Sequence, residues 1–328
     1  MSKLGTLDVS AFKVGSAGCK VYLGSVLVYE PTSPTPPLPD NYKIYFKYEG
    51  GDTYSAECSS SGEVVAISDV RSPQYPYSSM TDVYIGDCVQ TLSANCFSEC
   101  VSLSSVTISS AVTTVGINSS VGAGCFSKCY SLTGASIPNS VTNIGQYVFS
   151  SCSGLTSVNL PSGITSIPNN SFQDCSSLPN VTIPSGVTSI GNSAFAGCRA
   201  LGNVTLPDSL TSIGQYAFQA CSSPSFSSIT VPSGVTSISN GAFRNCSGIT
   251  EVTIPSGVTN IKLNAFRYDP ALEKVTIHAA TPPTLGSNVF ANGNDTFKIY
   301  VPSASVATYQ AASGWSNYAS RIQAIPNS

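Results

Sequence analysis

Charged residues are scarce in this sequence. Asp, Glu, Lys and Arg make up 9% of its 328 residues, whereas they supply about a quarter of an average soluble protein. The formal net charge is −3, so the chain offers no basic surface for neutralising phosphates or anionic lipids. We therefore expect neither nucleic acid nor a membrane surface as a partner. Ser, Thr, Gly and Asn fill the polar positions, which predicts a surface of hydroxyl and amide groups.

Long apolar runs are also missing. The start of the chain has no run of the roughly 7 to 15 apolar residues that a secretory signal needs. No stretch reaches the roughly 18 apolar residues that span a bilayer. We expect synthesis in a cytoplasm without signal-directed export, and no membrane insertion.

Residues for catalysis are few. His278 is the single histidine, so any Ser–His–acid or Cys–His arrangement would have to form around that position. Four carboxylates fall at scattered repeat positions with no common face: Asp174, Asp208, Glu251 and Asp269. A glycoside hydrolase instead needs two carboxylates that face each other across a cleft. We interpret these acids as solvated loop residues and predict a protein that is not an enzyme and holds neither a cofactor nor a metal.

What the sequence does contain is an internal repeat. A phenylalanine recurs, in most cases every 23 residues, at Phe97, Phe126, Phe149, Phe172, Phe195, Phe218, Phe243, Phe266 and Phe290. A cysteine follows three residues after seven of them, at Cys100, Cys129, Cys152, Cys175, Cys198, Cys221 and Cys246, and Asp269 takes the eighth place. Between these positions recur a stretch such as Val-Thr-Ile, a proline turn and a second short apolar stretch, which predict two short strands per repeat.

Each repeat is expected to form one coil, or rung, of a solenoid. A rung cannot bury its apolar face alone, but rungs stacked at about 4.8 Å align equivalent side chains into interior columns. The spacing of Phe and Cys places both on one face of a helical or 3₁₀ turn. The predicted core columns comprise Phe149, Phe172, Phe195 and Phe218 with Cys152, Cys175, Cys198 and Cys221.

The 12 cysteines leave three interpretations open. No Cys-x-x-Cys pair occurs and seven cysteines share one repeat position, which favours buried thiols packed as small apolar groups. Disulfides between neighbouring rungs and a zinc site are the alternatives, since adjacent strands lie near the lower limit of separation for a bridge.

The segment from Leu178 to Cys198 resembles the repeat of the BspA-like leucine-rich repeat family, L-x-x-V-x-I-P-x-x-V-T-x-I-x-x-x-A-F-x-x-C. The resemblance covers about residues 83–300. It implies a mainly β leucine-rich-repeat solenoid of about nine repeats with short helical turns. It also implies a role in adhesion and protein binding at a cell surface.

The repeats define a domain organisation. Residues 31–40 are proline-rich and predict a stiff linker. Residues 41–82 predict a β cap on the first rung, and residues 301–328 a helical cap on the last, with Tyr309 and Trp315 among its core contacts. The remaining segment, residues 1–30, predicts a β-hairpin over Lys20–Tyr29 with Gly24 and Ser25 at its turn.

The hairpin is similar to short N-terminal segments on tail and other virion proteins of bacteriophages that infect gut bacteria. That resemblance implies anchoring to other virion proteins through Val21, Tyr22, Leu23, Val26, Val28 and Tyr29. The alternative is an ordinary strand pair packed back on the solenoid.

Two threonine columns are expected on the surface. One includes Thr182, Thr205, Thr230 and Thr253, and the other includes Thr188, Thr211 and Thr236. Such columns either stabilise the sheets or offer a nearly neutral face for a host-surface protein or glycan.

Three functions remain to be separated. The leading hypothesis is a non-enzymatic virion decoration or fibre-like protein of a bacteriophage, located on the particle. This hypothesis leaves undecided whether the chain forms a homo-oligomer there. The second is a BspA-like adhesin on a bacterial cell surface. The third, a repeat-based hydrolase, is opposed by the shortage of catalytic groups.

Overall fold

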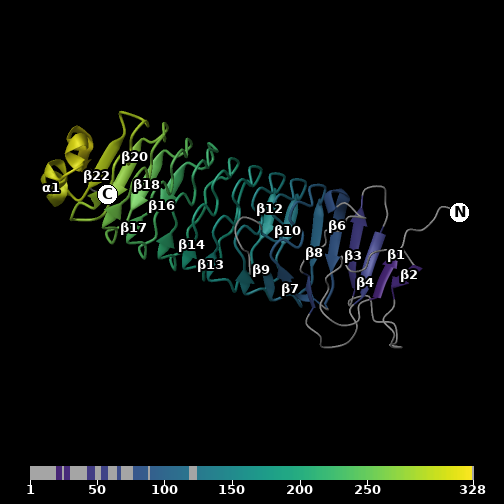
Figure 1. Cartoon of the computed structure of the whole chain (residues 1–328). Coiled ribbons are helices and arrows are strands. Elements are labelled where there is room, and N and C mark those ends of the chain that lie inside the picture. Colours follow the sequence, from purple (N-terminus) through teal and green to yellow (C-terminus); the bar gives the residue numbers. More distant parts are fainter. Residues whose placement is uncertain are drawn as a thin grey trace. The chain divides into compact units, whose positions relative to one another are not determined.

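The computed structural model describes residues 20–23, 26–29, 43–48, 53–57, 65–67, 77–87, 89–117 and 124–326. The chain divides into two compact units, Met1–Gly163 and Ile164–Ser328, and each contains stacked β rungs (Figure 1). The predicted fold class, a mainly β solenoid with a short C-terminal helix, is confirmed. The proposed linker at 31–40 and the Gly24–Ser25 turn lie outside the described residues.

The strands of the first unit are β1 (Lys20–Leu23), β2 (Val26–Tyr29), β3 (Lys43–Tyr48), β4 (Thr53–Glu57), β5 (Val65–Ile67), β6 (Met80–Ile85), β7 (Val89–Ser93), β8 (Ser105–Ile108), β9 (Thr114–Ile117), β10 (Gly134–Ser136), β11 (Asn143–Ile144) and β12 (Ser157–Asn159). Among the described residues they form one sheet in the order β12-β10-β8-β6-β3-β4-β1-β2 and another in the order β11-β9-β7-β5. A 3₁₀ helix, Tyr77–Ser79, precedes β6.

The first sheet changes character at β6. The strands from β6 to β12 pair in parallel with a register that aligns Val83, Val106 and Ala135, as stacked rungs require. β3 and β4 add to β6 in antiparallel fashion and cover the open end of the stack. β1 and β2 form an antiparallel hairpin, and β1 also pairs with β4. The hairpin therefore continues the capping sheet.

The strands of the second unit are β13 (Ser166–Ile167), β14 (Ser189–Ile190), β15 (Ser212–Ile213), β16 (Ser228–Thr230), β17 (Ser237–Ile238), β18 (Glu251–Ile254), β19 (Asn260–Ile261), β20 (Lys274–Ile277), β21 (Thr284–Leu285), β22 (Lys298–Val301) and β23 (Ile322–Ala324). They form sheets in the orders β13-β14-β15, β16-β18-β20-β22-β23 and β17-β19-β21. Every pairing in them is parallel, as expected for consecutive coils.

The turn that carries Phe and Cys in each repeat, here called the Phe turn, differs from the prediction. We expected a helical or 3₁₀ turn. The Cys198 N–H does donate to the Phe195 carbonyl at 3.2 Å, the i to i+3 bond of a single turn, but the segment is not continued into a helix. Residues on both sides have left-handed backbones, with φ of 51° at Ser193 and 76° at Gly197. The N–H groups of residues 193, 195 and 197 donate to the carbonyls of Gln215, Ala217 and Gln219 on the next rung. Alternating backbone conformation thus gives the Phe turn its own ladder, which a helical turn could not form because its N–H groups point along the helix axis.

The phenylalanines stack in columns within each unit. In the first unit the ring centroids of Phe97, Phe126 and Phe149 are separated by 5.4 and 5.5 Å. In the second unit the column runs through Phe172, Phe195, Phe218, Phe243, Phe266 and Phe290, with centroid separations of 5.2 to 5.7 Å. These rings are almost fully buried, and each stacked pair contributes about 0.5–1.5 kcal/mol beyond area burial.

The cysteines that follow the phenylalanines are buried free thiols. The Cys198 thiol donates to the Phe172 carbonyl at 3.1 Å, and the Cys221 thiol to the Phe195 carbonyl at 3.2 Å. Burial raises the pKa of the Cys152 thiol to about 12. A small side chain with one weak donor therefore satisfies a carbonyl of the preceding rung, which explains why cysteine recurs at this position.

The C-terminal end of the stack is closed by aromatic side chains. The segment after β22 contains a 3₁₀ turn, Ser303–Ser305, the helix α1 (Val306–Ala311) and a 3₁₀ helix, Trp315–Arg321. Tyr309 and Trp315 are fully buried. The Tyr309 hydroxyl donates to the Ala279 carbonyl at 2.8 Å, and the Trp315 indole N–H donates to the Pro283 carbonyl at 2.7 Å. Trp315 is thus a capping side chain. None of the described helices is long and apolar enough to cross a membrane.

Candidate binding face

The candidate site lies on the first strand of each repeat in the second unit. In the Val-Thr-Ile segments the two apolar side chains point inward, as at Val181 and Ile183, which are 8% and 7% exposed. The threonine between them points outward. Thr182, Thr205 and Thr230 are exposed and Thr253 is half-buried. We call this outward column the first-strand face.

The first-strand face is interrupted at two rungs. Thr230 and Thr253 face each other in a regular parallel ladder, whereas residues 180–183 and 203–206 have no strand pairing among the described residues. Their Val-Thr-Ile and Val-Thr-Leu sequences would have predicted ordinary strands.

One residue position, directly after the buried Leu178 and Leu201, differs between the interrupted rungs and several regular ones. In several regular rungs a Ser or Thr hydroxyl there donates to the same position of the preceding rung, as from Thr156 to the Thr133 carbonyl at 2.9 Å. Pro179 and Gly202 take this position in the interrupted rungs and have no hydroxyl, and Pro179 also lacks an N–H. Glu273 takes the same position and has no such hydroxyl, yet β18 and β20 pair regularly, so this difference accompanies the interruption and does not by itself explain it.

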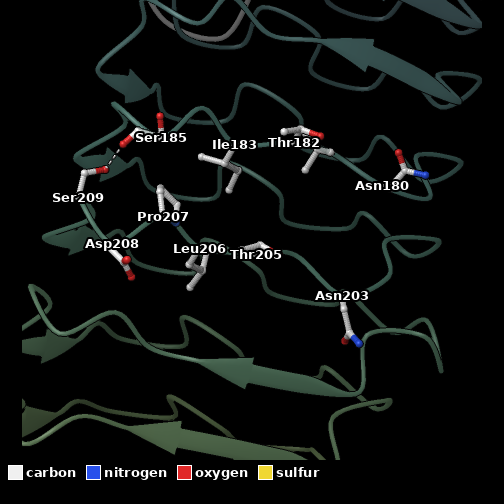
Figure 2. Close-up of a pocket in the computed structure, with 11 residues that line it drawn as sticks. Asn180, Thr182, Ile183, Ser185, Asn203, Thr205, Leu206, Pro207, Asp208 and Ser209 are labelled. Atoms are coloured by element: carbon white, nitrogen blue, oxygen red, sulfur yellow. Dashed lines mark hydrogen bonds between the residues drawn. The ribbon is translucent and has the colours of Figure 1, made fainter.

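A surface pocket of about 700 Å³ occupies the interruption. Figure 2 shows Thr182 and Ile183 on one side of it and Thr205 and Leu206 on the other, with Asn180 at one end. The full lining is Asn180, Val181, Thr182, Ile183, Ser185, Asn203, Thr205, Leu206, Pro207, Asp208 and Ser209. Its floor is apolar and its rim carries hydroxyl and amide groups, so a neutral molecule with many hydroxyl or amide groups fits it chemically.

Hydrogen bonds hold the two rungs together at both ends of the pocket. At one end the Gly202 N–H donates to the Pro179 carbonyl at 2.8 Å. At the other, the Ser209 hydroxyl donates to the Ser185 carbonyl at 2.7 Å, which is the dashed line in Figure 2. The pocket is therefore bounded along the strand direction and built into the stack.

The two amide side chains that line the pocket differ in their hydrogen bonding. The Asn203 side-chain oxygen accepts from the N–H groups of Ser227 and Ser228 at 2.8 and 3.1 Å, which fixes its orientation. Asn180 is exposed, and its side chain makes no hydrogen bond to another described residue. Asp208, also exposed, is the single charged residue of the lining. Sequence reasoning did not identify Asn180 or Asn203, because their importance depends on the opening beside them.

The hydroxyl groups of the second threonine column form hydrogen bonds between neighbouring rungs. The Thr188 hydroxyl donates to the Thr165 carbonyl and the Thr211 hydroxyl to the Thr188 carbonyl, both at 3.1 Å. The Thr259 hydroxyl likewise donates to the Thr236 carbonyl at 3.3 Å. Since the hydroxyl hydrogens of these threonines are engaged between rungs, the binding hypothesis is better supported for the first-strand face.

One of the predicted solvated acids is not solvated. Asp174, Asp208 and Glu251 are exposed, but Asp269 is only 1% exposed, so that part of the prediction is wrong. Its Oδ1 accepts from the Cys246 N–H at 2.7 Å, while its Oδ2 has no hydrogen-bond partner among the described residues. Burial raises the pKa of Asp269 well above its usual value. Asp269 belongs to the interior because it occupies the cysteine position of the repeat.

No cluster for catalysis or metal binding lines the pocket. His278 is exposed at the end of β20 and is not among the lining residues. Within the described part of the chain, no group of three or more His, Cys, Asp or Glu side chains is placed to hold a metal ion. The face as built can bind by shape and hydrogen bonding.

Comparison with known proteins gives one family. The model for the BspA type leucine-rich repeat region matches residues 68–119, 117–225 and 222–313, well over half of the chain. No curated protein matches significantly.

Several solved structures are similar. A leucine-rich repeat protein of T. pallidum is 22% identical, with 78% of this chain and 89% of that chain covered and a TM-score of 0.44. One from Bacteroides ovatus is 19% identical, with 89% and 100% covered and a TM-score of 0.40. A leucine-rich cell surface protein from Faecalibacterium prausnitzii is 21% identical, with 91% and 100% covered and a TM-score of 0.38.

Proposed function

The chain belongs to the BspA-type leucine-rich repeat family, and from this premise we propose that it is a non-enzymatic recognition scaffold that binds a neutral surface glycan or protein through its first-strand face. The single observation that carries the proposal is the pocket between residues 180–185 and 203–209. A repeat protein gains nothing in stability from leaving two rungs unpaired, because each lost ladder bond forgoes about 0.5–1.5 kcal/mol. An opening in an otherwise regular stack is therefore the part of the surface best suited to a ligand.

The chemistry of the lining supports a neutral ligand. Asn180, Thr182 and Thr205 can each donate and accept hydrogen bonds, and the apolar side chains beneath them can contact the carbon skeleton of a sugar or a peptide. Asp208 is the single charge at the rim, so an anionic ligand would be repelled there. Such a site binds weakly alone and gains strength when several copies are displayed together.

A binding assay tests this function. The double variant Asn180→Ala/Thr205→Ala and the blocking variant Thr205→Trp should both reduce binding to an array of neutral oligosaccharides and bacterial surface polysaccharides by tenfold or more, since each removes hydrogen bonds of about 1 kcal/mol or fills the pocket. The matched control Thr142→Ala/Asn143→Ala changes an exposed pair elsewhere and should bind as the wild type does. Undiminished binding by the Thr205→Trp protein would remove the pocket from the proposal.

Catalysis is tested separately. Incubation of the protein with the polysaccharide that it binds should release no new reducing ends. Their release would replace the recognition function by a hydrolase.

The location that we propose is a bacteriophage particle, with the chain attached to other virion proteins through the N-terminal hairpin. β2 ends the capping sheet, so one of its edges has no strand beside it among the described residues, and such an edge can accept a strand from a partner. Val26, Val28 and Tyr29 belong to β2. Display on a bacterial cell surface is the alternative, favoured by the family resemblance.

Deletion of residues 1–30 separates the two locations. If the truncated protein no longer joins purified particles while the full chain does, the anchor is supported. Equal incorporation of both proteins would refute it, and the cell-surface role would then be preferred.

A further inference from the structure

Two arginines occupy equivalent positions on consecutive rungs of the second unit. Arg244 and Arg267 each follow a stacked phenylalanine in the Phe turn, and the rungs are joined there by the Asn245 N–H, which donates to the Arg267 carbonyl at 2.8 Å. Both side chains are half-buried. In a chain with only 14 Lys and Arg residues, two adjacent guanidinium groups form a local concentration of positive charge.

The two guanidinium groups share one aromatic ring. The Cζ atoms of Arg244 and Arg267 lie 5.4 and 4.5 Å from the ring centroid of Tyr268. They are therefore within roughly 10 Å of one another, close to the Debye length of about 8 Å at physiological salt. The ring fixes both side chains by cation–π contact, but it does not neutralise their charges.

No carboxylate compensates the pair. The Lys128 Nζ lies 2.6 Å from the Glu99 Oε1, and the Lys274 Nζ lies 3.6 Å from the Glu251 Oε1. By contrast, neither Arg244 nor Arg267 has an ion-pair partner among the described residues. Asp269 is close in sequence, but its carboxyl is turned to the Cys246 N–H in the interior.

The arginines also carry buried donors without acceptors. The Nε atoms of Arg244 and Arg267 are both buried and have no hydrogen-bond partner in the part of the chain that the structure describes. Because both Nε atoms are buried, an external acceptor reaches the two guanidinium groups through their terminal N–H groups.

We propose that Arg244 and Arg267, held by Tyr268, bind an acidic group of an external ligand: a carboxylate, sulfate or phosphate on a surface polysaccharide. Guanidinium groups pair with such oxyanions through two parallel N–H donors each. One oxyanion that accepts from the terminal N–H groups of both guanidinium groups relieves the repulsion between the charges. The site differs from the pocket of the first-strand face in position and in ligand charge, so it goes beyond the proposed function and stands independently of it.

The proposal predicts charge-selective binding by the full chain. Calorimetric titration with a heparin-derived oligosaccharide, an oligogalacturonate and a polyglycerol phosphate presents sulfate, carboxylate and phosphate groups in turn, and maltoheptaose is the neutral probe. At least one acidic probe should bind, and Arg244→Gln/Arg267→Gln should weaken that binding about a hundredfold, the effect of two charged hydrogen-bonding groups.

Three further variants make the test specific. Arg199→Gln/Lys262→Gln removes the same charge from exposed positions and should weaken binding by less than about threefold, the change expected from long-range screening alone. Arg244→Lys/Arg267→Lys keeps the charge but loses the paired donors, so it should still weaken binding about tenfold. The lysine variant also tests the proposed oxyanion site if the glutamine variant does not fold. Asn180→Ala/Thr205→Ala should leave acidic binding unchanged, which separates this site from the pocket.

The outcomes that overturn the proposal are definite. It fails if no acidic probe binds better than maltoheptaose. It also fails if the arginine variants lose no more affinity than Arg199→Gln/Lys262→Gln, because binding would then follow net charge instead of a built site.

Discussion

Replacing Asp269 by asparagine should make the stability of this protein less dependent on pH. In most rungs a cysteine thiol donates to the phenylalanine carbonyl of the rung before, as Cys246 does to Phe218 at 3.0 Å. Asp269 holds the equivalent position with an ionisable group instead. Its Oδ2 is buried and unpartnered among the described residues, and an ionised Asp269 cannot donate as the thiols do.

The sign of the effect follows from the pKa. Burial raises the pKa of Asp269 in the folded state above its unfolded value. Between the two pKa values the folded protein binds more protons than the unfolded chain, so stability falls as pH rises through that window. Below the unfolded pKa, about 4, the carboxyl is protonated in both states and this loss is absent.

The size of the stability difference follows from the unpartnered Oδ2 of Asp269. An unsatisfied buried polar group costs about 1–3 kcal/mol, and more when charged. Asp269→Asn keeps an oxygen for the Cys246 N–H and supplies a neutral donor on the other side. The variant should therefore be more stable than the wild type by about 1–3 kcal/mol at pH 7, and this advantage should shrink toward zero near pH 4.

Urea unfolding of both proteins between pH 4 and pH 8, followed by circular dichroism, measures this difference. Asp269→Cys restores the repeat residue, and its stability relative to the wild type should change with pH in the same way as that of the asparagine variant. A stability difference between wild type and Asp269→Asn that stays constant over this pH range would falsify the reasoning, because the titration of Asp269 would then not be linked to folding.

Four further outcomes are expected. Phe195→Ala should cost about 3–5 kcal/mol in urea unfolding, because the ring stacks on Phe172 and Phe218 at 5.2 and 5.3 Å; a loss below about 1 kcal/mol would contradict the packed column. Tyr309→Phe should cost about 1–3 kcal/mol by leaving the Ala279 carbonyl unpaired, and an unchanged melting temperature would count against the cap. Gly248→Ala should prevent stable folding because the new Cβ overlaps the Ser223 carbonyl, whereas Gly163→Ala, where the Cβ meets nothing within 4 Å, should be tolerated. Iodoacetamide at pH 8 should modify Cys152 only after unfolding, since burial raises the pKa of that thiol to about 12; rapid labelling of the native protein would show that the column is open.

The sequence alone determined the repeat, its period and the direction in which most side chains point. A phenylalanine every 23 residues and a Val-Thr-Ile alternation leave one way to bury the apolar side chains, which is to stack coils in register. For that reason the solenoid could be predicted. The first-strand face could be predicted too, because inward and outward positions on a strand alternate locally.

Only the tertiary structure decided the features that depend on neighbouring rungs. The pocket depends on two neighbouring coils, because residues 180–185 of one coil and 203–209 of the next line it. Asp269 is buried because the stack places it in the cysteine column, and Arg244 meets the ring of Tyr268 only when the next coil lies above it. A strand or a turn is specified by residues close in sequence, whereas a pocket, an unpaired charge or a buried carboxyl is specified by what the adjacent coil does or does not supply.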